Sequence, residues 1–583
     1  MKRPSLGTVT EVSTTKVSVR LQDYARGSVV AHADGISTIG QPGDLIGIEG
    51  GSSLLIARIE AIQMFDTAFA PGRRAELEPV RVLEAVTIGR IVKSGEDMVF
   101  HPDRSKLPPL GAQVVGLTSS ELSVVLAPKS VNSACEDVLI GESVSASNVP
   151  ISIGMDALLT RHFAVLGASG QGKTHFVASV LQKLLKAGPN ARIVIFDIHD
   201  EYGSAFRGLP QVTLKETVLG TNRTDDTREH FRIPYYSLGL AGLSRLILPS
   251  EKTQRPALNF AVDKLRFVES DASGSRLIGQ AHNCMFGDGR PGNADAAHTA
   301  IESLKNLTAN PAQQWPHMSA LVHLAAEWAA LKRNGRGVME RSAWDYGNVA
   351  PMLQRISRLI RDSRFNEIIG IGPSGLLNPP GILNYGNETR SLVDKIFGPS
   401  GNSEWNVHIV GIKNLPGDLT PYILGSLLEL YAEELFRRGA GESYPTLLVL
   451  EEAHHYLRQI PGDVDTGLHT LAYERLAREG RKFQVSMLIS TQRPSEVSPT
   501  VLAQCGTWAV FRLTNERDQA VVSSGSEQAS RYATAQIPGL ARGQMVMFGD
   551  ALPLATKIKV ARPIVGFEPS SEDASFADAW SII

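Results

Sequence analysis

The stretch RHFAVLGASGQGKT, from Arg161 to Thr174, decides the fold of this chain. Its first half is an apolar run typical of a buried strand, and its second half satisfies the pattern GxxxxGK followed by Ser or Thr at every fixed position. Phe176, Val180 and Leu184 then recur every four residues and predict an amphipathic helix. Strand, glycine-rich loop and helix form the context in which this motif binds a nucleotide.

The glycine-rich loop is expected to hold the phosphates of ATP. Glycines let consecutive backbone N–H groups face the phosphates, and the helix N-terminus adds its dipole. Lys173 would neutralise phosphate charge, and the Thr174 hydroxyl would ligate Mg²⁺. The expected nucleotide-binding residues are Gly167, Ala168, Ser169, Gly170, Gln171, Gly172, Lys173 and Thr174.

A second apolar run, in LLVLEEAHHYL, ends in two carboxylates. A buried parallel strand would deliver Glu451 and Glu452 at its carboxyl end, where α/β proteins place their ligands. Glu451 is expected to hold the magnesium through water, and Glu452 to polarise the attacking water. The alternative is an exposed pair that caps the start of a helix.

A further acidic motif, DIHDEYG, follows the strand ARIVIFD. Asp197 ends that strand, and Asp200 lies close behind it. Carboxylates there can help to place a metal or the lytic water. Alternatively, both are turn and N-cap residues.

The stretch LAREGRKFQVSMLISTQRPSEV combines a basic cluster with a strand. Gln492, at the end of the strand, is placed where a polar side chain could sense the γ-phosphate. Arg478, Arg481 and Lys482 precede the strand, and an arginine that reaches across a subunit interface can neutralise transition-state charge. The alternative is a solvated basic helix end. Arg161 could approach the nucleotide or a neighbouring subunit, or it could be a simple charge at the start of a strand.

The order of elements predicts an α/β fold with a mostly parallel sheet covered on both faces. Short alternating runs over residues 1–126, ending with LSVVLAP from Leu122, predict a small β-barrel for assembly or partner docking. The P-loop ATPase core is expected at 127–203 and 401–549, with a helical subdomain at 204–400 inserted into it. Residues 271–315 and 370–403 read as long loops. A last strand and a tail occupy 550–583.

Composition gives few functional clues. Among 583 residues, 58 Lys and Arg nearly balance 60 Asp and Glu, so any DNA contact must come from a local patch. Cys135, Cys284 and Cys505 have no metal-binding spacing and predict buried thiols. Neither a signal peptide nor an apolar membrane span is recognisable, which favours a cytoplasmic protein.

Four motifs together resemble the HerA family within the FtsK–HerA group of hexameric DNA-pumping ATPases. They are RHFAVLGASGQGKT, DIHDEYG, VLEEAHHYL, and LAREGRKFQVSMLISTQRPSEVSPTVLAQC followed by FRLTNERD. The resemblance implies a RecA-like core with an N-terminal β-barrel and an inserted helical bundle. Where the family commonly has Pro and Gly in its acidic motif, this chain has Ile198 and Asp200.

The resemblance also implies a function. It implies a homohexamer that moves double-stranded DNA through its pore with ATP and Mg²⁺, together with a nuclease such as NurA or, in antiphage defence, a nuclease or sirtuin-type NADase. It assigns catalysis to Glu452, γ-phosphate sensing to Gln492, and the trans-acting role to Arg478 or Arg481.

Two other functions use the same ATP site. One is a ring scaffold that assembles and regulates a defence effector with little DNA pumping of its own. The other is a conjugation-type coupling ATPase, which would normally carry a membrane anchor.

Overall fold

The computed structural model of the chain describes the following residues: 5–14, 16–22, 29–32, 35–38, 41–51, 53–65, 80–94, 97–103, 105–128, 137–145, 149–221, 226–267, 294–306, 314–372, 374–375, 385–457, 472–525 and 531–570. The chain divides into two compact units. The first unit comprises Met1–Pro189, Met487–Ser495 and Leu502–Ile583, and the second comprises Asn190–Ser486 and Glu496–Val501. Among the described residues, no helix combines the length and apolarity that crossing a membrane requires.

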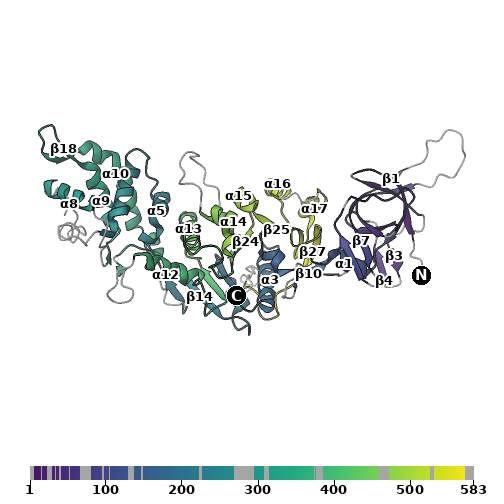
Figure 1. The fold of residues 1–583 in the computed structure, drawn as a ribbon. Coiled ribbons are helices and arrows are strands. Elements are labelled where there is room, and N and C mark those ends of the chain that lie inside the picture. Colours follow the sequence, from purple (N-terminus) through teal and green to yellow (C-terminus); the bar gives the residue numbers. More distant parts are fainter. Residues whose placement is uncertain are drawn as a thin grey trace, which may run out of the picture. The chain divides into compact units, whose positions relative to one another are not determined.

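The N-terminal part of the first unit is a closed antiparallel β-barrel, drawn in purple and blue in Figure 1. Its strands follow the order β2-β1-β9-β5-β6-β7, and pairing of β2 with β7 closes the ring, while β8 adds to the outside of β7. The strands are β1 (Ser5–Val12), β2 (Val17–Leu21), β5 (Leu45–Gly50), β6 (Ser53–Phe65), β7 (Val80–Ser94), β8 (Asp97–His101) and β9 (Gln113–Gly116). A separate hairpin joins β3 (Val29–His32) to β4 (Gly35–Thr38).

Alternation of side chains fills the barrel. Val17 and Val19 on β2, and Ile46 and Ile48 on β5, point into a buried cluster with alternate residues of β6 and β7. Successive side chains of a strand face opposite sides of a sheet, so one apolar set lies inside. The predicted small barrel is therefore confirmed.

One predicted strand of this region is a helix. LSVVLAP lies mainly in α1 (Ser119–Leu126), which begins with a capping box: Thr118 accepts from the Glu121 N–H, and the Glu121 carboxylate accepts from the Thr118 N–H. These bonds satisfy amides that would otherwise have no partner at a helix start. Val125 and Leu126 are buried on one face. The expectation of a strand missed the Thr-x-x-Glu signal that precedes the apolar run.

The remainder of the first unit is a mixed sheet with the order β11-β10-β27-β26-β25-β12-β24. Strands β25, β12 and β24 run parallel, and the others pair antiparallel. The strands are β10 (Val138–Ser143), β11 (Pro150–Ile153), β12 (His162–Leu166), β24 (Val485–Thr491), β25 (Cys505–Val510), β26 (Gln544–Gly549) and β27 (Thr556–Val560). The helices are α2 (Met155–Leu159), α3 (Lys173–Ala187), α16 (Glu516–Gly525) and α17 (Arg531–Gln536).

The second unit contributes a parallel sheet with the order β23-β13-β22-β14-β15. The strands are β13 (Arg192–Asp197), β14 (Leu214–Leu219), β15 (Glu229–Phe231), β22 (Val407–Gly411) and β23 (Thr446–Leu450). Its helices are α4 (Gly203–Phe206), α13 (Thr420–Arg438), α14 (Ala472–Glu479) and α15 (Pro499–Leu502). Strands β13, β22 and β23 are buried at every position, as parallel strands covered on both faces require. The predicted α/β class with a RecA-like P-loop core is confirmed.

Strands β14 and β15 fall within residues 204–400, which the sequence analysis assigned to the helical subdomain. Both run parallel in the sheet of the second unit, with β14 beside β22. The first three residues of β14 are only partly buried, and this weakens the apolar sequence pattern by which a buried strand is recognised. The sheet therefore extends further along the chain than the sequence indicated.

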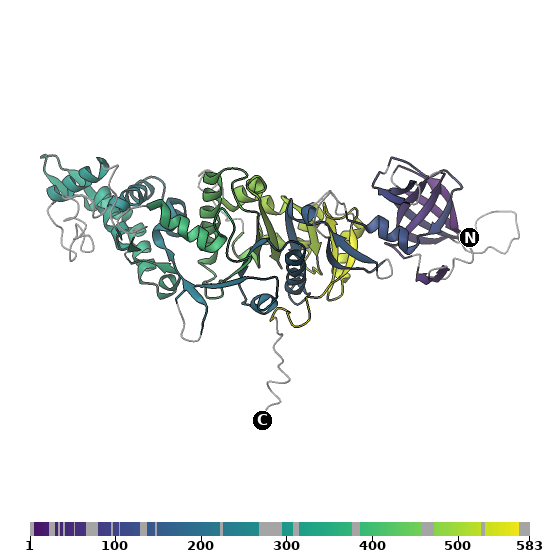
Figure 2. The same ribbon diagram turned by 60° about the horizontal axis from the view of Figure 1, so that its bottom comes forward.

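The rest of that region is mainly helical, as expected, and its teal helices form a bundle in Figure 2. Leu258, Leu321 and Met352, on three of these helices, are buried. The helices are α5 (Gly239–Ile247), α6 (Gln254–Lys264), α8 (Ala294–Asn306), α9 (Ser319–Ala330), α10 (Ala343–Arg361), α11 (Ser363–Ile368) and α12 (Tyr385–Phe397). Short strand pairs join β16 (Ile233–Pro234) to β20 (Ile369–Gly370), β17 (Gln314–Trp315) to β21 (Ser374–Gly375), and β18 (Leu331–Arg333) to β19 (Met339–Arg341).

Two expected loops contain helices. Helix α8 lies within 271–315, and α12 lies within 370–403, so both stretches were wrong as continuous loops. Phe397 of α12 is buried and stacks on Tyr431 of α13 with ring centroids 4.1 Å apart. Packing against α13 therefore stabilises α12, although the glycine-rich sequence around this helix is typical of a loop. Parts of both stretches, and the tail from residue 571, lie outside the described residues.

Candidate functional site

The glycine-rich loop lies in the first unit between β12 and α3. Gly167, Gly170 and Gly172 have φ values of 156°, 71° and 102°, which favour glycine because other side chains clash there. A Cβ atom on Gly167 would lie 2.5 Å from the Cβ of Phe511. The loop therefore needs glycine at Gly167 both for its backbone angle and for close packing.

Backbone bonds from three parts of the first unit fix the loop. The Gly167 N–H donates to the Thr491 carbonyl at 3.2 Å, and the Ala168 N–H donates to the Arg512 carbonyl at 2.9 Å. The Gly543 N–H donates to the Gln171 carbonyl at 3.1 Å. These partners lie at the end of β24, just after β25 and just before β26, so the sheet preorganises the loop.

Helix α3 is anchored behind the loop by aromatic packing. Phe176 is fully buried and makes edge-to-face contacts with Phe163, at 6.3 Å between centroids, and with Phe511, at 5.7 Å. Val180 and Leu184 are buried on the same face. The predicted amphipathic helix is confirmed, and its buried stripe fixes the direction of its N-terminus.

The N-terminus of α3 suits an anion. Its N-cap, Gly172, supplies no side-chain acceptor, and its first turn contains no acidic residue. Lys173 is 7% exposed, and its ammonium donates to the Ala168 carbonyl at 3.2 Å, so its charge lies across the loop. Helix-terminal amides beside a lysine provide a phosphate site. The loop residues therefore fit the phosphates of a nucleotide.

A group of carboxylates lies in the second unit. Glu451 follows β23, is 3% exposed, and accepts from the Tyr202 phenol at 3.3 Å. Burial, then the negative charges of Asp197, Glu201 and Glu452, hold the pKa of Glu451 well above its ordinary value. An isolated buried carboxylate is costly, and a cation or a proton relieves that cost. The group is thus suited to a site that meets positive charge.

Glu452 has an unusual backbone conformation. Its φ is 44°, in the left-handed region that non-glycine residues rarely adopt. Its carbonyl accepts from the His455 N–H at 2.9 Å, and its Oε2 lies 3.3 Å from Nδ1 of His454. Such strain, of the order of 1–2 kcal/mol, concentrates at functional sites. The exposed pair of helix-cap carboxylates considered above is excluded, because both side chains are buried.

Asp197 is fully buried and bonds to its own loop. Its Oδ1 accepts from the N–H groups of His199, at 3.2 Å, and Asp200, at 2.8 Å, and its Oδ2 accepts from the N–H of Tyr202 at 2.9 Å. Burial raises the pKa of Asp197, while these amide bonds lower it. Its oxygens order the loop that carries Tyr202, so Asp197 has a turn-forming role, although its charge is buried and not solvated.

Asp200 also has left-handed backbone, with φ of 63°. The glycine common at this place in HerA-like motifs adopts that angle without strain. Here the Asp200 carboxylate pairs with Arg228, whose Nη2 lies 3.0 Å from Oδ2. Arg228 also pairs with Asp226 at 2.7 Å. Asp200 therefore serves the turn and a charge network rather than a separate site.

Gln492 and the basic cluster lie on different units. Gln492 directly follows β24 in the first unit and is half-buried. Arg478 lies in the last turn of α14, and Arg481 lies in the short helical turn after it; both are exposed in the second unit. Among the described residues, neither guanidinium makes an ion pair. Arg161 instead pairs with Asp550 at 2.9 Å, which favours the strand-start interpretation for it.

Three contributors to the site were not assigned from sequence. Tyr202 and His454 lie inside the quoted motifs, and the available signal was their position beside an acidic residue: Tyr202 directly follows Glu201, and His454 lies two residues after Glu452. Arg228 had no such signal, since it meets Asp200 only through folding. Cys505 is buried and free, as predicted, while Cys135 and Cys284 lie outside the described residues.

Within the described part of the chain, no group of three or more His, Cys, Asp or Glu side chains is arranged to hold a metal ion. A nucleotide site does not need such a group, because Mg²⁺ keeps several waters there and takes only one or two protein ligands besides phosphate oxygens. Thr174 at the start of α3 and Glu451 at the end of β23 are the side chains of the appropriate type.

Comparison with known proteins agrees with this arrangement of motifs. Residues 138–333 match the family model described as helicase HerA, central domain. The chain is 23% identical over 459 residues to the DNA double-strand break repair helicase HerA of Pyrococcus furiosus, covering 76% of this chain and 74% of that protein. It is 24% identical over 514 residues to the protein of the same name from Sulfolobus acidocaldarius, covering 86% of this chain and 84% of that one.

Solved structures include VirB4 of Thermoanaerobacter pseudethanolicus, which is 13% identical. That comparison covers 76% of this chain and 100% of the VirB4 chain, with a TM-score of 0.45.

Proposed function

Because the chain is similar to HerA helicases over most of its length, we propose that it is an ATP-dependent motor of the HerA type that translocates or unwinds double-stranded DNA. The proposal includes a hexameric ring with DNA in its pore. What supports the ATPase activity is a preorganised P-loop with Lys173 across it, in a chain that also carries buried carboxylates directly after a parallel strand.

The P-loop residues Gly167 to Thr174 bind the nucleotide in this proposal. Lys173 neutralises phosphate charge, and the α3 N-terminus contributes its amides and dipole. Thr174 and Glu451 hold Mg²⁺, which would stabilise the charge that develops on the phosphates. Placing a cation beside Glu451 offsets the cost of burying its carboxylate, and so couples nucleotide binding to the stability of this site.

Glu452 is the proposed catalytic carboxylate. It accepts or orients a proton of the attacking water, and its left-handed backbone together with the 3.3 Å contact to His454 limits where its oxygens lie. Preorganisation of this kind places a catalytic group without a rearrangement during the reaction. Gln492 would sense the γ-phosphate from the end of β24.

Asp197 and Tyr202 hold the neighbouring loop. Asp197 orders the loop through three amide bonds, and the Tyr202 phenol then donates to Glu451. We therefore propose that Asp197 positions the metal-binding carboxylate and does not ligate the metal itself.

Arg478 and Arg481 are the candidates for a trans-acting arginine. Both are exposed, and in the described part of the chain their guanidinium groups have no ion-pair partner, so either can reach the nucleotide of another subunit. A correctly placed arginine contributes about 10³-fold or more to phosphoryl transfer. This assignment is the reason that the proposal includes a ring.

A partner protein completes the proposal. We propose a nuclease or another effector such as an NADase, in DNA-end processing or in antiphage defence. The N-terminal barrel is the proposed docking element, because it closes on itself and, in the residues that the structure describes there, carries none of the candidate catalytic groups.

The decisive measurement is ATP turnover with and without duplex DNA of unrelated sequences. A translocating motor must treat successive steps alike, so stimulation is expected for every sequence. If six or more phosphates are contacted, DNA affinity should fall by about 10³-fold or more between about 50 and 200 mM salt.

A different result would favour the scaffold function. Turnover that ignores DNA at all salt concentrations, but rises when an effector protein is added, would refute the motor and support a ring that regulates its partner. Lys173→Ala serves as the control for ATP hydrolysis by a contaminant.

A further inference from the structure

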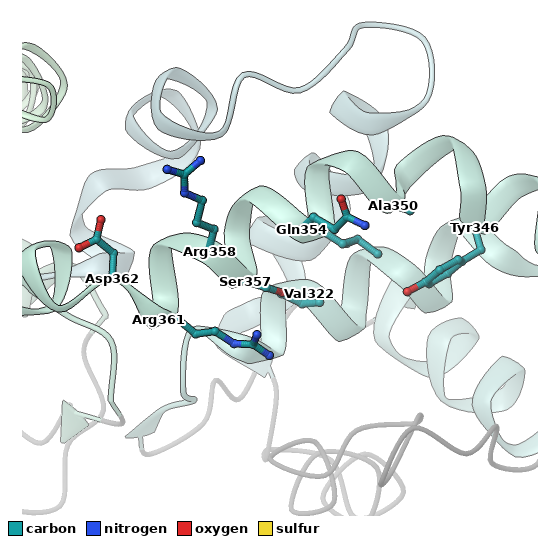
Figure 3. Close-up of a pocket in the computed structure, with 9 residues that line it drawn as sticks. Val322, Tyr346, Ala350, Gln354, Ser357, Arg358, Arg361 and Asp362 are labelled. Atoms are coloured by element: carbon teal, nitrogen blue, oxygen red, sulfur yellow. The ribbon is translucent and has the colours of Figure 1, made fainter.

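A hollow of about 670 Å³ lies on the helical subdomain, far along the chain from the P-loop and carboxylate motifs. Figure 3 shows it along α10, with Val322 contributed by α9. The lining residues are Val322, Tyr346, Ala350, Leu353, Gln354, Ser357, Arg358, Arg361 and Asp362. We call this hollow the α10 groove.

The α10 groove follows one stripe of the helix. From Tyr346 to Arg361, lining residues recur three or four positions apart, which places them on the same helix face. At about 1.5 Å per residue the stripe is about 22 Å long. The groove is therefore long and open rather than a closed pocket for a small molecule.

Positive charge on this stripe is not balanced. Arg358 and Arg361 are exposed, and in the described part of the chain neither guanidinium has an ion-pair partner. Asp362 is already engaged: it accepts from the Arg364 N–H at 2.9 Å and pairs with its guanidinium at 3.2 Å, and the latter bond lowers the pKa of Asp362.

Other arginines of the same subdomain differ in this respect. Arg341 pairs with Glu327 at 2.8 Å, and Arg355 donates to Gln254 at 2.8 Å. Both side chains thus stabilise the bundle, whereas Arg358 and Arg361 do not. Their charge is available to an anion.

The rest of the lining suits an aromatic ligand. Tyr346 is 44% exposed, and its ring borders the groove with its hydroxyl toward the arginine end in Figure 3. Gln354 and Ser357 provide hydrogen-bonding groups, and Leu353 provides apolar surface. Cationic groups that track a backbone, combined with aromatic rings for bases, are typical of sites that bind single strands.

We propose that the α10 groove binds a single strand of nucleic acid, with Arg358 and Arg361 on phosphates and Tyr346 stacked on a base. Stacking requires an unpaired base, so a duplex would gain only the phosphate contacts. The proposal extends the proposed helicase function, because strand separation would supply the single strand. Its test measures binding without ATP, so the two proposals can fail separately.

The test is fluorescence anisotropy with the nucleotide-free full-length protein. The probes are labelled oligothymidylate and a duplex of equal length. The double substitution Arg358→Ala with Arg361→Ala should weaken single-strand binding about tenfold or more. For this double variant, the slope of log affinity plotted against log salt concentration should become shallower by about 1.4, because each single-strand phosphate contact contributes about 0.7 to the slope.

Substitutions of Tyr346 separate stacking from charge. Tyr346→Ala should weaken the binding of oligothymidylate at least about fivefold while changing the affinity for duplex little. Tyr346→Phe should retain single-strand binding. The matched control is Arg336→Ala, which removes an exposed arginine from the β18–β19 turn outside the groove. It should leave both affinities unchanged.

Folding and location are checked independently. The conservative pair Arg358→Lys with Arg361→Lys should retain most of the binding, and basal ATP turnover should be unchanged in every variant. In the wild type, a photo-crosslinkable bromouracil oligonucleotide should label an α10 peptide. Crosslinks confined to other elements, equal loss of duplex and single-strand binding in Tyr346→Ala, or wild-type affinity in the double alanine variant would each overturn the proposal.

Discussion

Asp197 offers a sharp test of how the acidic motif works. We expect Asp197→Ala to loosen the loop of residues 198–202 and to lower ATP turnover without changing the Mg²⁺ requirement. The reason is that its two carboxylate oxygens accept three backbone N–H groups, at distances of 2.8 to 3.2 Å. A direct metal ligand would give the opposite pattern.

The magnitude follows from the burial of the three donors. Tyr202 is fully buried, so its N–H loses its partner without replacement by water, at a cost of about 1–3 kcal/mol. His199 is exposed and Asp200 is half-buried, so water can replace the oxygen for about 0.5 kcal/mol each. Removing a carboxylate whose pKa is raised by burial returns part of this energy. The net loss is about 2 kcal/mol.

Hydrogen exchange measured by mass spectrometry reads this loss directly. About 2 kcal/mol corresponds to about 30-fold faster exchange of the loop amides, because 1.36 kcal/mol is a factor of ten. Asp197→Asn keeps one oxygen acceptor and should give an intermediate increase. Asp103→Ala is the control: Asp103 also accepts a backbone N–H, from Ser105 at 2.8 Å, but in the barrel.

Two results would refute this reasoning. Unchanged exchange of residues 198–202 in Asp197→Ala would mean that the amide bonds do not hold the loop. An increase in the Mg²⁺ concentration for half-maximal turnover, with normal exchange, would instead make Asp197 a metal ligand.

Three further predictions concern the ATP site. Lys173→Ala should abolish nucleotide binding, whereas Glu452→Gln should bind ATP and fail to hydrolyse it. Equilibrium binding of a fluorescent ATP analogue, measured together with ATP turnover, distinguishes the two variants. Near-wild-type turnover in either variant would contradict the assignment. A variant lacking Arg478 or Arg481 should regain partial activity when mixed with Lys173→Ala subunits, and mixtures with no recovery count against action in trans. Glu451→Gln should raise the melting temperature of nucleotide-free protein at neutral pH, because burial raises the pKa of Glu451 and makes its ionised form unfavourable in the folded state. This gain in melting temperature should shrink as the pH falls from the pKa of Glu451 in the folded state to below the pKa of an ordinary glutamate, where Glu451 is protonated in both the folded and the unfolded state. A gain that grows as the pH falls would contradict the prediction.

Strands of the ATPase core were readily predicted from sequence because they are apolar throughout. The apolar run that ends before Gln492 is β24 (Val485–Thr491), and the strand ending at Asp197 is β13. Fully buried parallel strands carry this signal in every residue. The P-loop was equally clear, since its glycine angles, φ of 71° at Gly170 and 102° at Gly172, fix the residue type.

Features that depend on distant contacts could not be predicted in the same way. Strand β14 is only partly buried at its start and is identified by its pairing with β22. Helix α12 is stabilised by the stacking of Phe397 on Tyr431, which no local pattern reveals. The α10 groove likewise depends on which arginines find acidic partners, and sequence spacing does not decide that.

The two acidic motifs share one structural device. Asp200 and Glu452, after the adjacent parallel strands β13 and β23, both turn the chain through left-handed backbone that ordinarily costs about 1–2 kcal/mol per non-glycine residue. At Asp200 the bidentate Arg228 contact offsets that cost, so an aspartate can replace the glycine common in HerA-like motifs. At Glu452, Oε2 lies 3.3 Å from Nδ1 of His454. Backbone strain of this kind concentrates at functional sites, which supports the catalytic role proposed for the Glu452 carboxylate.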